Sequence, residues 1–435
     1  MKAKKLMALL LSAVMVMSAA AGCGSASDSK GKESADNDEV VELEFWGWWS
    51  SEARKPYIQE MVDGFNESQD KYRVKYVDIP WGDIFTKNTA QIAAGKPCDI
   101  IANSMEEVQF RASEGQVESL DEYLTDDVKD AFYSQYMEDC TGEDGSVYAL
   151  PYSVDTRAIY YNKAHFEEAG IKPEDIQTWS DLEEAAKKLD KKNGEEYERV
   201  GFLPLLGNNS LDTWIINANG GQGWFNEESL EVTVDTETNK EAFKWVRSQI
   251  ERYGQATFDS YQAAFNSGMT DPFASGKMSM LIQTSAYTSS LAQTAPDLEY
   301  GVIPFPEFKE GTGHVTNGGG FVLEIPKGAK CPEGSYEFIK YATSKETQEF
   351  LSSKMGDFSA RVDFDENSEF YQNPINQDLA KCLENTATII VPNELKGYND
   401  VINPLIEEGT LGIVDTDTAL ANGQKALEDF VASNK

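Results

Sequence analysis

Strands and helices alternate along the early part of this chain in an order that restricts its fold to one class. Val41–Trp46 and Tyr72–Val77 alternate apolar and polar residues, as half-buried strands do, and Asp99–Ala102 is a short apolar strand. Between them, Arg54–Asn66 and Trp81–Ala94 carry apolar residues at helical spacing. This β-α-β-α-β order predicts an open α/β sheet with helices packed on its faces.

The remainder of the chain continues the pattern and is long enough for a second domain. A helix is predicted to begin with Ser180 as its N-cap and Glu183 three residues later, which fits a capping box. Because the part from Val40 onward exceeds the size of one typical hydrophobic core, we expect two domains. Further strands are predicted at Thr156–Tyr161, Met278–Ile282, Tyr300–Pro304 and Phe321–Ile325.

The first residues have the composition of an export signal. A basic head, Met1–Lys5, precedes the apolar run Leu6–Ala21, which is shorter than the ~20 residues that a membrane-spanning helix needs. The following Gly22-Cys23 resembles the lipobox of bacterial lipoproteins, in which the cysteine is lipidated, although Ala20 stands where leucine is commoner. The resemblance implies a signal peptide over residues 1–22 and a lipid anchor on Cys23, which places the protein on the extracellular face of the cell membrane.

Composition narrows the function classes. Residues 23–39 hold almost no apolar side chain and are predicted to form a flexible tether. The formal net charge of −36 disfavours nucleic acid as a partner. Cys98, Cys140, Cys331 and Cys382 have no metal-site spacing, and free buried thiols are the favoured interpretation, with disulfides left open. With two histidines in the chain, a zinc site or a histidine-based catalytic triad has few candidate residues.

Several segments together resemble the extracellular solute-binding proteins of bacterial sugar importers, the family that includes maltose-binding protein. These are the strand that ends in Trp46-Gly47-Trp48-Trp49, the run Ile92–Ile101, the run Leu150–Lys163 with Tyr161-Asn162-Lys163, the run Phe273–Met280, and Gly318-Gly319-Gly320 before a strand. The resemblance extends over nearly all of the chain from Val40 onward. No single segment is specific, but they occur in the order that the family has.

The resemblance implies a fold, a partner and a function. The fold would be α/β, a two-lobe periplasmic-binding-protein-like fold in which each lobe is an open α/β sheet and the ligand cleft lies at the hinge. Lobe one would comprise 40–152 plus 301–355, and lobe two 153–300 plus 356–435. The protein would capture a carbohydrate, an oligosaccharide given its many aromatic residues, and deliver it to the permease subunits of an ABC transporter. It would be a monomer without catalytic activity or cofactor.

Sugar chemistry indicates which residues would hold the ligand. Aromatic rings stack on the apolar faces of sugars, and carboxylates, amides and arginine bind the hydroxyl groups. Aromatic residues at the carboxyl ends of strands, where open α/β sheets bind ligands, are therefore candidates. Alternation along the first strand predicts that Trp46 and Trp48 face one side and Trp49 the other. Asp155 matches a position at which relatives carry a sugar-binding glutamate. The candidates are Trp46, Trp48, Trp49, Trp81, Asn103, Tyr152, Asp155, Trp214, Tyr287, Asn317, Gly318, Gly319 and Arg361.

Other functions stay open on the sequence. The same fold can bind a polyamine, a peptide, iron or a phosphate ester, and polyamine sites also use tryptophan and aspartate. A purely adhesive surface lipoprotein is a further alternative. An exported glycoside hydrolase needs two carboxylates at a set separation. In a chain with 74 acidic residues, pairs of carboxylates are so common that their presence does not indicate such an enzyme. Motifs for serine hydrolases, zinc proteases, phosphate loops and dinucleotide binding are missing from the sequence. The sequence does not indicate which sugar would bind.

Overall fold

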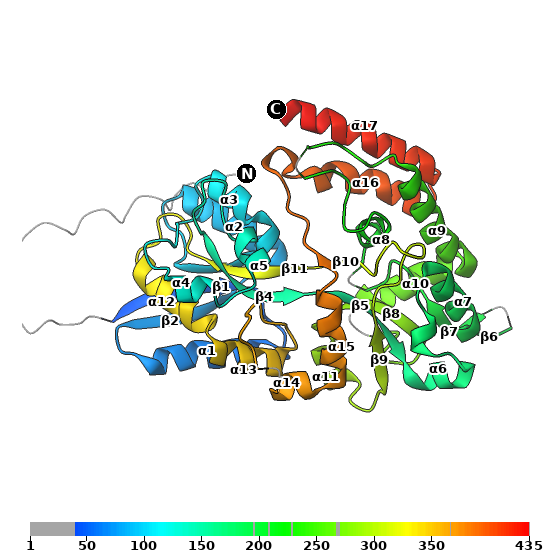
Figure 1. The fold of residues 1–435 in the computed structure, drawn as a ribbon, viewed down its shortest axis with the longest axis horizontal. Coiled ribbons are helices and arrows are strands. Elements are labelled where there is room, and N and C mark those ends of the chain that lie inside the picture. The colour runs from blue at the N-terminus through cyan, green and yellow to red at the C-terminus, as the bar shows by residue number, and fades with distance from the viewer. Residues whose placement is uncertain are drawn as a thin grey trace, which may run out of the picture. The chain divides into compact units, whose positions relative to one another are not determined.

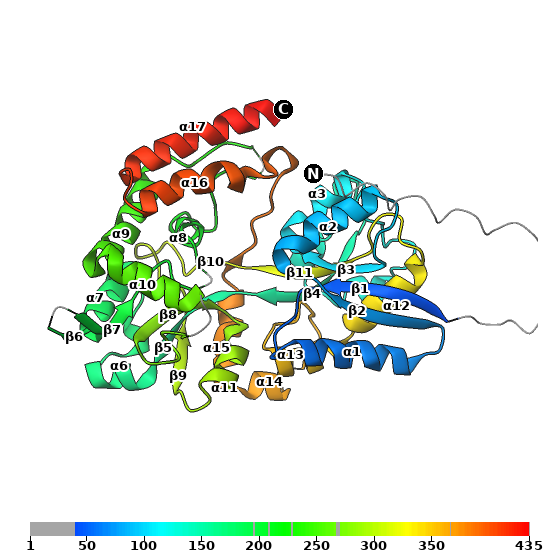
Figure 2. The same ribbon diagram turned by 180° about the vertical axis from the view of Figure 1, so that it is seen from behind.

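The structure is a computed structural model that describes residues 40–194, 196–207, 209–227, 229–266, 270–365 and 367–434. The predicted signal peptide, the tether and the lipidation site Cys23 lie outside these residues. Everything from Val40 onward forms one compact unit, and this unit contains two five-stranded sheets (Figures 1 and 2).

The first sheet has the strand order β2-β1-β3-β11-β4. Strand β1 is parallel to β2 and β3, whereas β11 is antiparallel to β3 and β4. The elements β1, α1, β2, α2 and β3 follow one another along the chain, which confirms the predicted β-α-β-α-β order. Helix α1 packs on the sheet through one apolar face, formed by Tyr57, Ile58, Met61 and Phe65. The elements of this part are β1 (Val41–Gly47), α1 (Lys55–Ser68), β2 (Tyr72–Asp78), α2 (Trp81–Ala93), β3 (Ile100–Ser104), η1 (Met105–Glu107), α3 (Val108–Ser113), α4 (Asp126–Lys129), α5 (Ser134–Asp139), β4 (Ala149–Asp155), β11 (Gly319–Glu324), α12 (Pro332–Ala342) and α13 (Lys345–Met355).

The second sheet has the strand order β6-β7-β8-β5-β9. Strand β5 is antiparallel to β8 and β9, and β7 is parallel to β8. Its strands and helices are β5 (Arg157–Asn162), α6 (Lys163–Ala169), η2 (Pro173–Asp175), α7 (Trp179–Leu189), β6 (Lys191–Asn193), β7 (Glu196–Phe202), α8 (Leu211–Ala218), α9 (Glu237–Tyr253), α10 (Gln255–Asn266), β8 (Met278–Thr284), α11 (Tyr287–Thr294), β9 (Tyr300–Ile303), α15 (Pro374–Leu383), α16 (Tyr398–Thr410) and α17 (Thr416–Asn434).

Helix α7 begins two residues earlier than the sequence predicts. Its N-cap is Thr178, and the side chains of Thr178 and Asp181 form the reciprocal hydrogen bonds of a capping box. The predicted pair Ser180 and Glu183 is therefore wrong. The reason is that Trp179 packs in the core as the first helical residue, so burial of this ring sets where the helix starts.

The chain passes between the two sheets in several segments. Thr156 alone separates β4 of the first sheet from β5 of the second. The return runs through β10 (Thr316–Asn317), which pairs with β12 (Thr386–Ala387), and into β11. A third segment leaves α13 and reaches α14 (Glu369–Gln372). The short helix η3 (Asn393–Leu395) lies between β12 and α16. The predicted lobe boundary at residue 301 falls inside β9, which pairs with β5, so a boundary after β9 fits the strand pairing better.

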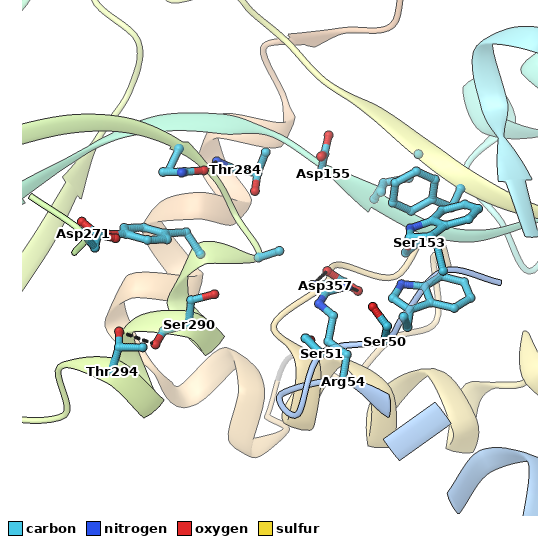
Figure 3. A pocket seen from close by; sticks show the side chains of 18 of the residues that line it. Ser50, Ser51, Arg54, Ser153, Asp155, Asp271, Thr284, Ser290, Thr294 and Asp357 are labelled. Carbon is cyan, nitrogen blue, oxygen red and sulfur yellow. Dashed lines mark hydrogen bonds and ion pairs between the residues drawn. The ribbon is translucent and has the colours of Figure 1, made fainter. Parts of the chain in front are cut away.

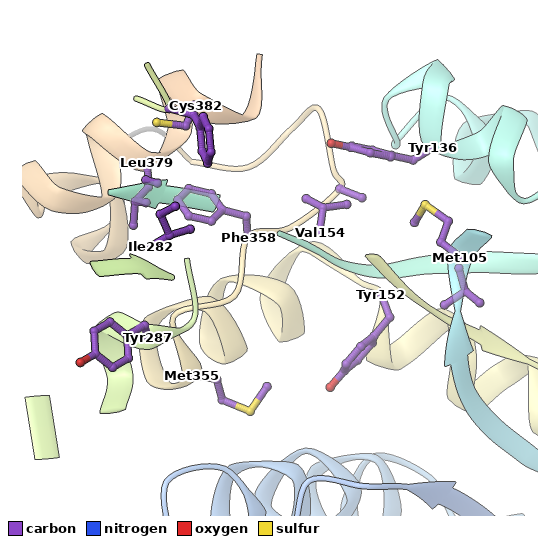
Figure 4. Packing of buried hydrophobic residues seen from close by; sticks show 14 of the residues in the cluster. Met105, Tyr136, Tyr152, Val154, Ile282, Tyr287, Met355, Phe358, Leu379 and Cys382 are labelled. Carbon is purple, nitrogen blue, oxygen red and sulfur yellow. The ribbon is translucent and has the colours of Figure 1, made fainter. Parts of the chain in front are cut away.

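Backbone pairing ties two of these segments together. The backbone N–H of Val154 donates to the carbonyl oxygen of Phe358 at 2.8 Å. Figure 4 shows Val154 and Phe358 between Tyr152 of the first sheet and Ile282 of the second. These side chains are buried, so apolar packing continues from one sheet to the other through the crossing.

Candidate functional site

A cavity of about 670 Å³ lies where the ends of the two sheets face each other. The first sheet contributes the loop after β1, the end of β4 and the start of β11, and the second contributes the end of β8 and the start of α11. We call this cavity the cleft. Its lining residues are Trp48, Trp49, Ser50, Ser51, Arg54, Ser153, Val154, Asp155, Phe265, Asp271, Gln283, Thr284, Ala286, Tyr287, Ser290, Thr294, Gly320, Phe321 and Asp357.

One wall of the cleft is aromatic. The rings of Trp48 and Trp49 stack with their centroids 5.0 Å apart, and the edge of Phe321 meets Trp48 at 4.8 Å. Trp81, at the start of α2, is 46 % exposed and packs edge-on against Trp48 with a centroid distance of 4.5 Å. Trp49 is 2 % exposed and supports the wall from behind, so the partly exposed rings of Trp48 and Phe321 are the ones that a flat apolar surface in the cleft can contact.

An ion pair lies at another side of the cleft, below Asp155 in Figure 3. The two terminal nitrogens of Arg54 donate to the two carboxylate oxygens of Asp357 at 2.8 and 2.7 Å. Both side chains are mostly buried. Burial alone would lower the pKa of Arg54, but Asp357 raises that pKa above its ordinary value. Arg54 is the residue before α1, and Asp357 is in the segment that leaves α13, so the pair joins the first sheet's helices to a crossing segment.

Asp155 lies at the end of β4, where the chain crosses to the second sheet. Its Oδ1 accepts a hydrogen bond from the backbone N–H of Gly319 at 3.1 Å. Burial raises the pKa of Asp155 above its ordinary value, and the negative charge of Asp357 acts in the same direction, although Arg157 opposes both. A half-buried carboxylate of this kind gains from any further hydrogen-bond donor that reaches it.

The opposite wall comes from the second sheet. Tyr287 begins α11, is 7 % exposed, and donates its hydroxyl hydrogen to Oδ2 of Asp271 at 2.5 Å. Burial, followed by the charge of Asp271, raises the pKa of Tyr287. Ser290 and Thr294 follow along the same helix toward the cavity (Figure 3). The cleft thus combines ring faces, hydroxyl groups and carboxylates.

Four of the residues predicted from the sequence meet in this cleft: Trp48, Trp49, Asp155 and Tyr287. Trp81 touches the aromatic wall from outside it. Trp46 belongs to a small hydrophobic cluster and Trp49 to the large one, but Trp48 packs against both clusters and stacks on Trp49. The predicted alternation is therefore not confirmed for Trp48, because β1 ends at Gly47 and the period of a strand does not extend beyond its end. The indole of Trp46 lies under the ammonium group of Lys87, 4.6 Å from the ring centroid, and does not line the cleft.

Three further candidates are packed into the interior instead. Asn103 is 1 % exposed and donates to Oε2 of Glu324 at 2.9 Å, within a buried network. Tyr152 is 1 % exposed and packs its ring against Trp49. Trp214 is completely buried, and its indole nitrogen donates to the carbonyl oxygen of Pro204 at 2.9 Å. The prediction that these three side chains line the cleft is therefore wrong.

The segment Asn317-Gly318-Gly319 holds the crossing strands together through its backbone and does not line the cleft. The N–H of Gly318 donates to the carbonyl oxygen of Ala387, and a Cβ on Gly318 would lie 2.3 Å from the carbonyl oxygen of Asp155. The carbonyl oxygen of Asn317 accepts a hydrogen bond from Arg157. The backbone donors expected to face a ligand are thus used within the protein, and glycine is required because two crossing strands approach closely.

Arg361 lines a different cavity, of about 600 Å³, between α5 and α15. Its guanidinium donates to both carboxylate oxygens of Asp363 and to the carbonyl oxygen of Thr343. It also lies over the ring of Phe132. The predicted contact of Arg361 with the cleft is therefore not found in the structure.

Three charged residues of the cleft were not among the residues predicted from the sequence: Arg54, Asp271 and Asp357. Arg54 lies in the loop after β1, so the strand-end rule that selected Trp48 could have found it. Asp357 is 303 positions away from its partner Arg54, and its pairing carries no local signal. Asp271 accepts from the backbone N–H groups of Phe273 and Ala274, a turn pattern that is common at structural positions.

Breaking the ion pair should destabilise the fold. Arg54→Met or Asp357→Leu alone leaves one mostly buried charge without its partner, so we expect each to lower the free energy of unfolding by ~1–3 kcal/mol. The double variant should lose less than the sum of the two, because it leaves no unpaired charge. Urea unfolding of the four proteins measures both quantities. If the loss of unfolding free energy in the double variant equals the sum of the two single losses, the ion pair makes no net contribution to stability.

Other features of the described residues bear on function. Cys98, Cys140, Cys331 and Cys382 are free thiols. Within this part of the chain, no group of three or more histidine, cysteine, aspartate or glutamate side chains could hold a metal ion. Helices long and apolar enough to cross a bilayer are likewise not found among the described residues.

Comparison with known proteins identifies the family. Residues 49–349 match the family of bacterial extracellular solute-binding proteins, and the chain belongs to this family. The match covers the loop after β1, the crossing at Asp155 and the start of α11, so it includes most of the cleft. The predicted family resemblance is confirmed.

Individual relatives are distant but cover much of the chain. A maltooligosaccharide ABC transporter solute-binding lipoprotein of Streptococcus pneumoniae is 23% identical over 99% of this chain and 98% of its own length. An arabinooligosaccharide-binding protein of Bacillus subtilis is 25% identical over 75% of this chain and 73% of its own. The structure of CpMnBP1 with mannotriose bound matches with a TM-score of 0.79 at 21% identity, covering 89% of this chain and 100% of that one. The two-lobe periplasmic-binding-protein-like fold is thereby confirmed.

Proposed function

We propose that this protein captures a carbohydrate, an oligosaccharide, in the cleft and delivers it to the permease subunits of an ABC importer. The observation that carries the proposal is the composition of the cleft, which sets the rings of Trp48 and Phe321 opposite hydroxyl and carboxyl groups. Ring faces suit the apolar side of a sugar, and carboxylates suit its hydroxyl groups. The sugar-related names of the relatives support the same ligand class.

Several parts of the proposal concern how the protein works rather than what it binds. The protein acts as a monomer, returns its sugar intact and has no enzymatic role. The lobes close around the ligand by a hinge motion at the crossing segments. A lipid on Cys23 holds the chain to the extracellular face of the membrane, in line with the description of the pneumococcal relative as a lipoprotein.

A thermal-shift screen tests the ligand class. The chain from Ser25 onward is mixed with mono- and oligosaccharides, spermidine, ferric citrate and peptides. A ligand present at 100 times its dissociation constant adds ~2.7 kcal/mol to the free energy of unfolding, which raises the midpoint by several degrees. We expect the largest shift with an oligosaccharide, and the sugar should be recovered unchanged.

Other results would overturn parts of the proposal. Tighter binding of a monosaccharide than of any di- to tetrasaccharide contradicts an oligosaccharide ligand. A shift with spermidine, iron or peptide alone would keep the fold and replace the ligand class. Release of shortened sugars during incubation would contradict a purely binding role.

A further inference from the structure

We propose that the cleft selects uncharged or amino-bearing sugars and rejects anionic ones, such as uronic acids and sugar phosphates. This inference rests on the proposed function and refines it, because it concerns the charge of the ligand in the same cleft. It follows from how the charged side chains of the lining are paired. Among the described residues that line the cleft, three are carboxylates and one is a cation.

The cation, Arg54, is committed to the protein. Both of its terminal nitrogens donate to Asp357, and one of them also reaches the carbonyl oxygen of Met355 at 3.4 Å. A bidentate guanidinium–carboxylate pair is neutral as a unit and geometrically saturated on the paired edge. The pair uses two of the five N–H groups of the guanidinium, so an anionic ligand that reached the others would meet a charge already neutralised by Asp357. Displacing Asp357 would instead leave a mostly buried carboxylate unpaired.

The other two carboxylates have no such cation in the lining. Asp271 accepts hydrogen bonds from two backbone N–H groups and from the hydroxyl of Tyr287, and these neutral donors leave its charge in place. Asp155 accepts from the backbone N–H of Gly319. Arg157 also acts on Asp155, but this arginine donates to the carbonyl oxygen of Asn317 and does not line the cleft.

The two carboxylates approach the cavity from different sides. In Figure 3, Asp155 lies at the crossing of the sheets and Asp271 lies on the wall formed by the second sheet. A ligand carboxylate or phosphate in the cleft would therefore face negative charge from both directions. The net charge of −36 adds a repulsion at longer range that salt screens.

Neutral sugars avoid this repulsion and use the same groups. Their hydroxyl groups can donate to Asp155, and their apolar faces can lie on the aromatic wall. An amino sugar would add an attraction between its ammonium group and the carboxylates. The pairing of Arg54 with Asp357 thus determines the selectivity, because an unpaired arginine in the same place would favour anions.

The test compares sugars that differ in one carboxylate. The affinities of maltotriose and mannotriose are measured by titration calorimetry in a buffer of low ionic strength. Each is compared with its own derivative in which C6 of the non-reducing sugar is oxidised to a carboxylate. For a neutral sugar that binds, we expect the uronate to bind about 100-fold more weakly, the order of effect for like charges within a shared site. In Asp155→Asn, the ratio of the two affinities should shrink at least about tenfold.

Matched variants separate local from general charge effects. Asp63→Asn changes the net charge equally, but Asp63 is exposed on α1 outside the cleft, so the ratio should stay as in the wild type. If Asp155→Asn does not fold, Asp271→Asn provides the same comparison from the other wall. A uronate that binds as tightly as its neutral partner would overturn the selectivity and leave the proposed function standing. Failure of every neutral oligosaccharide in the wider panel would overturn both.

Discussion

Replacing Trp214 by alanine is expected to lower the free energy of unfolding by ~3–5 kcal/mol. The indole is completely buried and meets the rings of Trp179, Phe305 and Trp245 at centroid distances of 4.8, 4.9 and 5.0 Å. Its removal leaves a large cavity and takes away one of the two hydrogen bonds that the carbonyl oxygen of Pro204 accepts, the other coming from the side-chain amide of Asn209. Urea unfolding, followed by tryptophan fluorescence and circular dichroism, measures the loss.

Trp81→Ala is the matched control for this prediction. Trp81 is 46 % exposed and packs its other side against Trp48 and Phe85, so its removal should cost ~1–2 kcal/mol of stability, less than the loss at Trp214. The order should be reversed for ligand affinity. Trp81→Ala should weaken binding more than Trp214→Ala, because Trp81 supports the aromatic wall and Trp214 lies in the interior among the helices of the second sheet. A Trp214→Ala protein that keeps its stability and loses ligand binding would contradict the buried placement.

This contrast shows why part of the site could not be predicted from the sequence. Trp48 and Trp49 were found because the end of a strand is recognisable from alternation, and the carboxyl ends of strands in such sheets meet at the ligand side. Trp214 lies on α8, and a tryptophan on a helix can face either the core or a cleft. The choice depends on which rings surround it, and Trp179, Phe305 and Trp245 come from three separate segments of the chain.

The elements themselves were largely predictable from local pattern. Val41–Trp46, Tyr72–Val77 and Asp99–Ala102 correspond to β1, β2 and β3 within one or two residues. Pairings between distant residues were not predictable in the same way. The ion pair of Arg54 and Asp357 depends on the return of the chain through the crossing, and no periodicity along the sequence carries that information.

Asp155 was predicted as a site residue from the sequence, but its contacts depend on residues far along the chain. Its importance was inferred from the family resemblance, whereas its surroundings come from Gly319 and Asp357, far along the chain. We expect Asp155→Ala to weaken the binding of the oligosaccharide found in the screen about 10- to 100-fold, since a hydrogen bond to a charged group contributes ~1.5–3 kcal/mol. Isothermal titration calorimetry on the wild type and the variant measures the change.

The same substitution should leave thermal stability nearly unchanged, because two effects oppose each other. Burial raises the pKa of Asp155, so above that pKa the ionised side chain destabilises the folded state relative to the unfolded chain, and its removal relieves this penalty. The loss of the acceptor leaves the N–H of Gly319 without its hydrogen bond, which destabilises the variant. Asp155→Glu, which keeps a carboxylate on a side chain one methylene longer, should recover part of the affinity that Asp155→Ala loses. If Asp155→Ala instead melts several degrees lower while the affinity of the folded fraction is retained, Asp155 holds the crossing together and does not contact the ligand.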